Sequence, residues 1–294
     1  MLFCIAKGTI VLIVSQILAI SQRENGADKK AFKYILWITI PVCVLIGLEN
    51  LSTAVMLFTV VFLMMFYGLV PLKQLMSLAG CIILIVVVVL ALVMLMGHEI
   101  SDEGKETAKI EQLEKSKEKN VVERIFHRFD TWKSRIVNFG KPMPPPEKFD
   151  LDKNAQVAHA NIAIVSSGIV GKGPGKSTER DFLAQAFSDF IFAIIIEELG
   201  LLGAFAVASL FVILLYRCAR IASRCEKNFP AFLVMGLGIL LSLQAFFNMM
   251  VTVGIVPVTG QPLPLISKGG TSTIINYAYI GAILSVSKYS NRKF

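Results

Sequence analysis

Residues 171–200 read GKGPGKSTERDFLAQAFSDFIFAIIIEELG, a glycine-rich polar loop that runs into an apolar segment. The apolar segment carries Asp189 at its start and Glu197 and Glu198 about two turns further on. An ionised carboxylate in a membrane span is costly unless it is paired or hydrated, and such residues usually mark function. The stretch therefore predicts a membrane helix whose mouth carries a functional acid.

The composition of the whole chain is that of a polytopic membrane protein. Of its 294 residues 55% are hydrophobic, and the mean hydropathy is +0.67, whereas soluble domains are about 45–50% apolar. The net charge of +8 comes from basic residues in short segments between apolar runs, which fits membrane orientation better than nucleic acid binding. The five cysteines show no paired spacing, and His98, His127 and His159 share no metal-ligand spacing, so we interpret these histidines as solvated loop residues.

Seven apolar runs alternate with polar segments. They cover approximately residues 8–20, 34–48, 54–70, 77–97, 187–216, 230–256 and 271–288. A helix needs about 20 residues to cross the hydrocarbon core, and the second and third runs require a very short turn between them. We predict an all-α polytopic membrane protein, one domain over residues 1–294, with about seven transmembrane helices and a long extracytoplasmic loop at residues 98–184.

The basic residues set the predicted orientation. Four lie between residues 217 and 227 and three more in the last seven residues, but only Lys268 lies between residues 257 and 270. Short loops rich in Lys and Arg stay in the cytoplasm. The C-terminus is therefore predicted inside, and an odd number of spans places Met1 outside.

The glycine loop has two open interpretations. It is similar to a GxxxxGK[ST] nucleotide loop, but the first glycine of that pattern would fall on Val170, so we reject a nucleotide site. It is either a flexible turn or a loop whose amides and cations approach a phosphate. The second interpretation assigns substrate binding to Gly171, Lys172, Gly173, Gly175, Lys176 and Ser177.

The carboxylates also have two interpretations each. Asp189 stands where the helix begins, so it could serve the helix N-terminus, and it could equally act as a general base. For Glu197 and Glu198 we favour a structural role, as hydrogen-bonding partners of a neighbouring helix. Residues 248–273, NMMVTVGIVPVTGQPLPLISKGGTST, are too rich in helix breakers for a lipid-facing helix and predict a broken or re-entrant segment that lines a cavity.

Three stretches together resemble the SEDS family of bacterial FtsW, RodA and SpoVE proteins. They are GKGPGKS, SDFIFAIIIEELG and PVTGQPLPLISKGGTST, which are similar to the family patterns GxGxGxS, PExxTDFIFAxxxEExG and PxTGxxLPxxSYGGSS, in the same order. The resemblance extends from Lys7 to the C-terminus and is strongest to the division-type members of Bacteroidetes. The sequence departs from the patterns at Ala184, Gln185, Ser188, Lys268 and Thr271.

The resemblance implies a ten-span peptidoglycan glycosyltransferase that polymerises lipid II during cell division. It places the catalytic aspartate on Asp189, the paired glutamates on Glu197 and Glu198, and a substrate-binding lysine on Lys7. Supporting positions in the third motif are Pro264, Ser267, Gly269 and Gly270. The seven predicted spans would then be the fourth to tenth of the family, which predicts an N-terminally truncated chain with an open flank near residues 1–20 and Lys7 unpaired.

The resemblance also implies a location and partners. These are the bacterial inner membrane at the division septum, lipid II, a class B penicillin-binding protein and further division proteins. No protein-held metal is predicted, and a divalent cation, Mg²⁺ or Mn²⁺, is left open as a partner of the pyrophosphate. Two alternatives stand beside this: a transporter of lipid-linked sugars, since transporters share broken helices and intramembrane acids, and an inactive scaffold.

Overall fold

A computed structural model describes residues 2–23, 26–81, 151–183 and 186–290. The chain divides into two compact units, Met1–Leu75 with Pro145–Phe294, and Met76–Pro144. The second unit is described only at residues 76–81, which are helical. Most of the predicted span at 77–97, and the part of the predicted loop before residue 151, lie outside the described residues.

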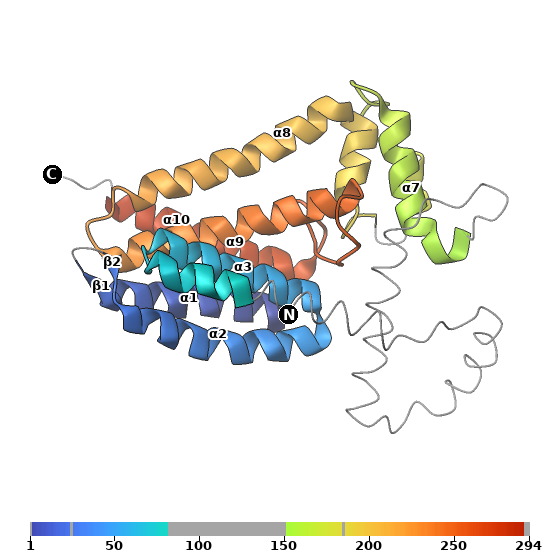
Figure 1. Ribbon diagram of the computed structural model, residues 1–294. Coiled ribbons are helices and arrows are strands. Elements are labelled where there is room, and N and C mark those ends of the chain that lie inside the picture. Colours follow the sequence, from blue (N-terminus) through green and yellow to red (C-terminus); the bar gives the residue numbers. More distant parts are fainter. Residues whose placement is uncertain (1, 24–25, 82–150, 184–185, 291–294) are drawn as a thin grey trace, which may run out of the picture. The chain divides into compact units, whose positions relative to one another are not determined.

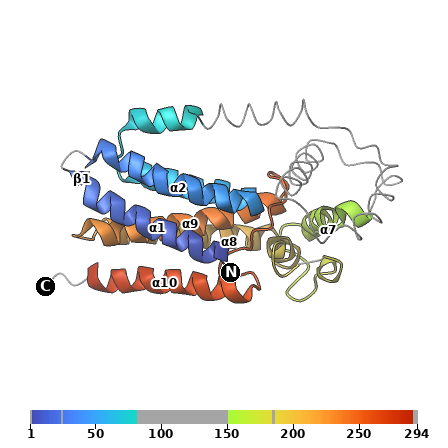
Figure 2. The same ribbon diagram turned by 90° about the horizontal axis from the view of Figure 1, so that it is seen from below.

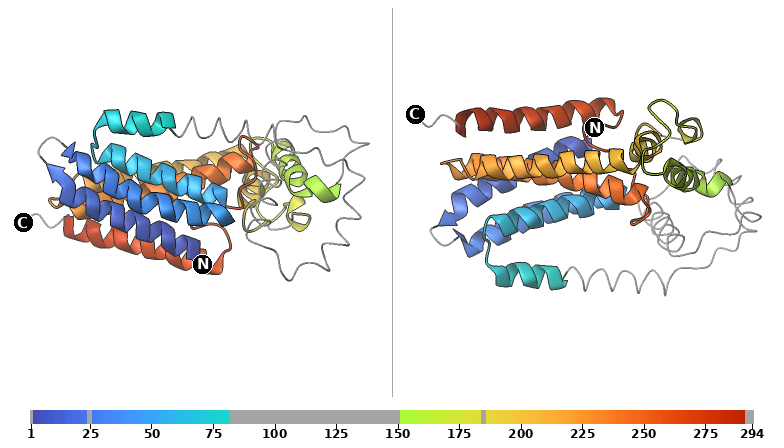
Figure 3. Two further views of the ribbon diagram at one scale, coloured as in Figure 1. Left: turned by 60° about the horizontal axis from the view of Figure 1, so that its bottom comes forward. Right: turned by 90° about the horizontal axis from the view of Figure 1, so that it is seen from above.

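Six long helices of the first unit run side by side (Figures 1 and 2). They are α1 (Leu2–Ser21), α2 (Lys29–Glu49), α3 (Leu51–Tyr67), α8 (Ile191–Ala222), α9 (Asn228–Thr252) and α10 (Gly270–Ser290). Helix α9 is the central one, because α1, α3, α8 and α10 all pack against it (Figure 3). Gly236 of α9 lets Val11 and Met64 approach closely, since a Cβ there would lie 2.7 and 2.6 Å from their side-chain atoms.

Asn50 explains how two spans fit into so short a stretch. Its backbone N–H donates to the Ile46 carbonyl at 2.7 Å and ends α2, while its side chain accepts from the Thr53 amide at 3.1 Å and caps α3. An Asn side chain at this position satisfies one of the free amides of a helix N-terminus. The predicted tight turn between the second and third apolar runs is therefore confirmed.

The all-α fold class is confirmed, while the count of seven spans is not established by the described residues. Four helices are long and apolar enough to cross a membrane, namely α1 from Cys4, α2, α8 and α9. Helix α3 is apolar but shorter, with 17 residues, and α10 occupies the last predicted run. Residues 253–269, between α9 and α10, contain neither helix nor strand, as their prolines and glycines predicted.

Four elements were not predicted. Strands β1 (Gln22–Arg23) and β2 (Gly26–Ala27) form an antiparallel pair between α1 and α2. Helix α7 (Leu151–Ser167) lies in the region predicted to be a polar loop, and it is followed by a short 3-10 helix, η3 (Glu179–Asp181). Ala160 and Ala163 of α7 pack on Phe190 and Ala193 at the start of α8, so small residues allow this close contact.

Candidate functional site

Asp189 lies in the turn that leads into α8, and its carboxylate does not cap the helix. The N-cap position is Phe190, without a side-chain cap, and the first turn of α8 holds no acid. The half-buried carboxylate of Asp189 accepts a hydrogen bond from the Ser188 hydroxyl at 3.0 Å, its one such bond among the described residues. A Cβ on Gly260 would stand 3.6 Å from Asp189 Oδ2. The acid therefore keeps acceptor capacity for another group.

The broken segment between α9 and α10 fixes the backbone on which Asp189 is mounted. The Ser267 hydroxyl donates to the Ser188 carbonyl at 2.5 Å, and the Lys268 amide donates to the Phe187 carbonyl at 2.8 Å. From α9, the Asn248 side-chain amide donates to the Asp189 carbonyl at 2.7 Å. Three hydrogen bonds from two distant parts of the chain thus hold residues 187–189.

Lys7 joins this assembly from α1, which corrects the prediction that it is unpaired. It is 4% exposed, and its ammonium donates to Gln261 Oε1 at 3.0 Å. The Gln261 side-chain amide in turn donates to the Thr53 hydroxyl, and the Gln261 carbonyl accepts from Asn248 at 2.7 Å. The expectation was wrong because a neutral amide on the broken segment reaches the buried cation. Lys7 therefore acts on the Asp189 segment through Gln261.

Glu197 is the centre of a second polar cluster, eight residues after Asp189. Its side chain is fully buried and forms an ion pair with Lys172 at 2.6 Å. The carboxylate also accepts from the Ser177 hydroxyl, from the Thr178 amide at 3.1 Å and hydroxyl at 2.9 Å, and from the Glu179 amide at 3.3 Å. A buried carboxylate with so many donors organises the loop around it, so the partners of Glu197 lie in this loop and not on the neighbouring helix that the sequence predicted.

The glycine loop docks where α8 is broken at Gly200 (Figure 1). Four backbone hydrogen bonds join them: Lys172 N–H to Glu197 O and Gly173 N–H to Glu198 O, both 2.9 Å, and Leu201 N–H to Gly168 O and Leu202 N–H to Ile169 O, both 3.4 Å. In a continuous helix the amide of Leu201 would pair with the Glu197 carbonyl, and that of Leu202 with the Glu198 carbonyl. The loop therefore takes over both partners of each bond that the break removes.

Two glycines make this docking possible. Gly200 has φ 68° and ψ −165°, and a Cβ there would stand 2.3 Å from the Ile169 carbonyl oxygen. Gly171 has φ 81°, and its Cβ would stand 2.4 Å from the Glu198 carbonyl oxygen. Side chains are excluded at both positions by conformation and by space. Gly171, which the sequence assigned to phosphate binding, here brings the main chain of the loop against that of α8.

The two lysines of the glycine loop differ. The Lys172 ammonium is held by Glu197 and donates to the Thr178 hydroxyl at 3.0 Å. Lys176 is exposed, and its side chain has no hydrogen bond or ion pair within the described part of the chain. From Ile191 to Glu197 the helix rises about 9 Å. The loop thus meets α8 further along than Asp189, and Lys176 is its free cation.

The other predicted site residues support the backbone. Glu198 is partly exposed, and its backbone carbonyl accepts a hydrogen bond from the glycine loop. Pro264 is buried in the broken segment. The Gly269 carbonyl accepts from the Thr273 amide at 2.9 Å and hydroxyl at 2.6 Å, and Gly270 begins α10. These residues shape the turn from the broken segment into α10.

Sequence reasoning missed part of the site and misread His159. Asn248 and Gln261 were not singled out, although an Asn inside an apolar run is itself an intramembrane polar signal. His159 is not a solvated loop residue: it lies on α7, its side chain is 19% exposed, its Nδ1 is 2.6 Å from Glu179 Oε2, and its ring stacks on Phe182. The error arose because α7 was read as loop.

No protein-held metal centre is indicated by the described residues. Among them, no group of three or more His, Cys, Asp or Glu side chains could hold an ion. The divalent cation left open above is a partner of the pyrophosphate and would not need such a group, and we assign no step to one.

Comparisons with known proteins come from sequence and from structure. The family model of cell cycle proteins, FtsW, RodA and SpoVE, matches residues 4–292. A probable peptidoglycan glycosyltransferase FtsW of Geobacter sp. (strain M18) is 38% identical over 154 residues, 52% of this chain and 41% of that protein. The peptidoglycan glycosyltransferase MrdB of Escherichia coli (strain K12) is 37% identical over 150 residues, 50% of this chain and 40% of that protein. Each alignment thus spans about two fifths of the relative's length.

One solved structure has the same fold. It is a chain described under "Structural coordination of polymerization and crosslinking by a peptidoglycan synthase complex", with a TM-score of 0.59 and 19% identity. The match covers 99% of this chain and 82% of that one. At this identity the likeness concerns the fold alone.

Proposed function

Because the chain belongs to the cell cycle protein family of FtsW, RodA and SpoVE, we propose that this multi-pass membrane protein is a peptidoglycan glycosyltransferase. The observation that carries the proposal is the position and hydrogen bonding of Asp189. Its carboxylate does not cap α8, its backbone is fixed by three hydrogen bonds, and its side chain keeps acceptor capacity. A positioned carboxylate with free acceptor sites is what a general base needs.

In the proposed reaction Asp189 takes the proton of the GlcNAc 4-hydroxyl of one lipid II molecule. The oxygen then attacks C1 of the MurNAc at the end of the growing glycan, and undecaprenyl pyrophosphate leaves with inversion at C1. Attacking and leaving oxygens stand on opposite sides of C1, so the base and the group that receives the pyrophosphate belong at different points of the site. The glycine loop meets α8 further along than Asp189, which supports this division of roles.

Lys176 is the residue of the glycine loop best suited to the leaving pyrophosphate. It is exposed, whereas the charge of Lys172 is compensated by Glu197. Cations aimed at a developing phosphate charge stabilise the transition state. In this proposal Lys172, Ser177 and Glu197 give the loop its shape, and Lys176 contacts the substrate.

The same proposal includes a location and a partner. The chain would lie in the bacterial inner membrane with a cytoplasmic C-terminus and act at the division septum. The fold match is to a chain of a complex that couples polymerization and crosslinking, which supports a class B penicillin-binding protein as partner. Lipid II and other division proteins complete the proposed partners.

The first test replaces the proposed base. Asp189→Asn keeps the size of the side chain but removes the proton acceptor, so we expect the rate of lipid II polymerisation to fall about 100-fold or more. The rate is measured with the purified chain and its transpeptidase partner in nanodiscs, from the length and amount of glycan formed.

Asp181→Asn is the matched control. Asp181 lies on η3, is 78% exposed and contacts only its neighbour Arg180 among the described residues. It should polymerise at the rate of the unmodified chain. If Asp189→Asn polymerised as fast as Asp181→Asn, with both correctly inserted, Asp189 would not be the base.

A further inference from the structure

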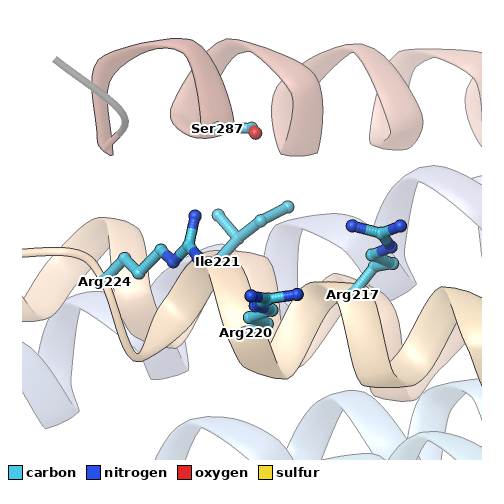
Figure 4. A pocket seen from close by; sticks show the side chains of 5 residues that line it. All are labelled: Arg217, Arg220, Ile221, Arg224 and Ser287. Carbon is cyan, nitrogen blue, oxygen red and sulfur yellow. The ribbon is translucent and has the colours of Figure 1, made fainter.

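The end of α8 opposite the Asp189 segment carries a basic pocket of about 370 Å³. Five residues line it: Arg217, Arg220 and Ile221 of α8, Arg224 of the turn that follows α8, and Ser287 of α10. Figure 4 shows Arg217 and Arg224 reaching toward the helix of Ser287 on either side of Ile221. None of these lining residues is acidic, so the pocket has a positive potential.

The spacing of the arginines explains why they share one pocket. Arg217 and Arg220 are neighbours on one face of α8, and Arg224 lies in the turn that follows, where its amide donates to the Ile221 carbonyl at 3.1 Å. All three side chains are exposed. The charges of Arg217 and Arg220 are close enough to repel each other, and although the dipole at the C-terminal end of a helix offsets part of that repulsion, a bound anion would offset more.

Membrane orientation alone does not account for the pocket. Positive residues are expected at this end of the helices, and Lys29, Lys30 and Lys33 of α2 meet that need as exposed side chains outside the pocket. At residues 217–224, by contrast, the cations are all arginines, they converge on one cavity, and a second helix adds a hydroxyl. Arginine forms paired hydrogen bonds to phosphate oxygens that lysine does not match.

We propose that Arg217, Arg220, Arg224 and Ser287 form a binding site for a phosphate-bearing anion. An anionic phospholipid headgroup and a free phosphate both present this chemistry. The phospholipid is the favoured source, because the pocket lies at the end of a helix long enough to span the bilayer, where headgroups gather. The site binds the phosphodiester through the guanidinium groups while Ser287 donates a further hydrogen bond.

The test measures binding by thermal unfolding of the full chain in a neutral detergent. One arm adds phosphatidylglycerol, a second adds phosphatidylcholine, and a third adds inorganic phosphate against sodium chloride of equal ionic strength. We expect phosphatidylglycerol to raise Tm, phosphatidylcholine to leave it unchanged, and free phosphate to act weakly. A shift with inorganic phosphate as large as that with phosphatidylglycerol would support the site and identify a soluble anion as its ligand.

Variants test whether the effect of phosphatidylglycerol on Tm arises at the arginine pocket. The triple change R217Q/R220Q/R224Q should weaken the apparent phosphatidylglycerol affinity at least tenfold. The matched control K29Q/K30Q/K33Q removes the same number of exposed charges and should retain the affinity. If the arginine variant does not fold, R217K/R220K/R224K keeps the charge and should still lose severalfold. Equal phosphatidylglycerol affinities in the folded arginine variant and the lysine control would overturn the proposal.

Discussion

Glu197 shows how a single side chain decides whether a polar loop is ordered. It is fully buried, and its carboxylate accepts hydrogen bonds from Lys172, Ser177, Thr178 and Glu179. The free energy of desolvating a carboxylate is recovered only when such donors surround it. The order of the glycine loop therefore depends on the negative charge of Glu197.

Neutralising Glu197 should destabilise the protein without touching Asp189. We expect Glu197→Gln to lose about 3 kcal/mol of unfolding free energy and to lower Tm by roughly 5–10 °C, because the Lys172 charge loses its partner. Glu198→Gln is the control, since Glu198 is partly exposed and serves the loop through its backbone. Thermal unfolding of both variants in detergent checks this, and equal Tm values would contradict it.

How much of the site could be predicted differs from residue to residue. The importance of Asp189 and Glu197 follows from their charge in an apolar run, which depends on sequence alone. The partners of Lys7 did not follow, because Gln261 is 254 residues away and its side chain has no charge to mark it. The difference between Lys172 and Lys176 was also invisible, since both lie in one short loop and only the fold brings Glu197 to one of them.

At the scale of elements, α8 consists of two helical segments joined at Gly200. Gly200 interrupts it with angles that a helix does not contain, and the glycine loop fills the interruption. Breaks in membrane helices are tolerated where other protein groups satisfy the freed backbone. The loop thus defines the direction of the first turns of α8, at whose mouth Asp189 stands.

Adding a side chain at Gly200 should destabilise the protein, and Gly281 in α10 serves as the control position. Gly200→Ala forces a Cβ into the Ile169 carbonyl and into a strained φ, so we expect a loss of about 2 kcal/mol or more and weaker polymerisation. Gly281→Ala lies in α10, where a Cβ meets no atom within 4 Å, and should gain up to about 1 kcal/mol. Tm and glycan assays on both variants test this. Equal Tm changes would show that Gly200 is not constrained.

The sequence predicted long elements better than short ones. Apolar runs predicted α2, α3, α9 and α10 to within a few residues, because burial in lipid requires uninterrupted hydrophobicity. Helix α7 was missed because its composition is mixed and because the contacts that stabilise it, such as the packing of its alanines on α8, are tertiary. The break in α8 was missed because glycine is common in membrane helices and no local feature marks one as bent.

At the scale of the whole described unit, Lys7 and Gln261 connect the beginning and the end of the chain. Their bond joins α1 to the broken segment, Thr53 brings in α3, and Asn248 brings in α9 and the Asp189 backbone. Buried polar groups of this kind are costly to leave unsatisfied, so they favour one arrangement of the helices. The network aligns three helices with the residue proposed as the base.

A double-mutant cycle measures this connection. We expect Lys7→Met and Gln261→Met each to destabilise the protein, and the double variant to lose about 1–2 kcal/mol less than their sum. Lys7→Met with Ser242→Ala is the control pair, because Ser242 bonds to Phe211 elsewhere, and its effects should add within about 0.5 kcal/mol. Additive losses in the first pair would mean that the Lys7–Gln261 bond contributes nothing to stability.

If the glycine loop detached from α8, the amides of Leu201 and Leu202 and the carbonyls of Glu197 and Glu198 could still form hydrogen bonds within the helix. The two amides after Gly200 would return to the carbonyls of Glu197 and Glu198, their ordinary partners one turn back, and glycine adopts helical angles as readily as its present ones. A straight α8 would therefore leave neither of these two helix amides unbonded. The groups that would lose partners are the Lys172 and Gly173 amides of the loop and the Glu197 carboxylate. The attachment of the loop to α8 therefore depends strongly on electrostatic interactions of one side chain, Glu197.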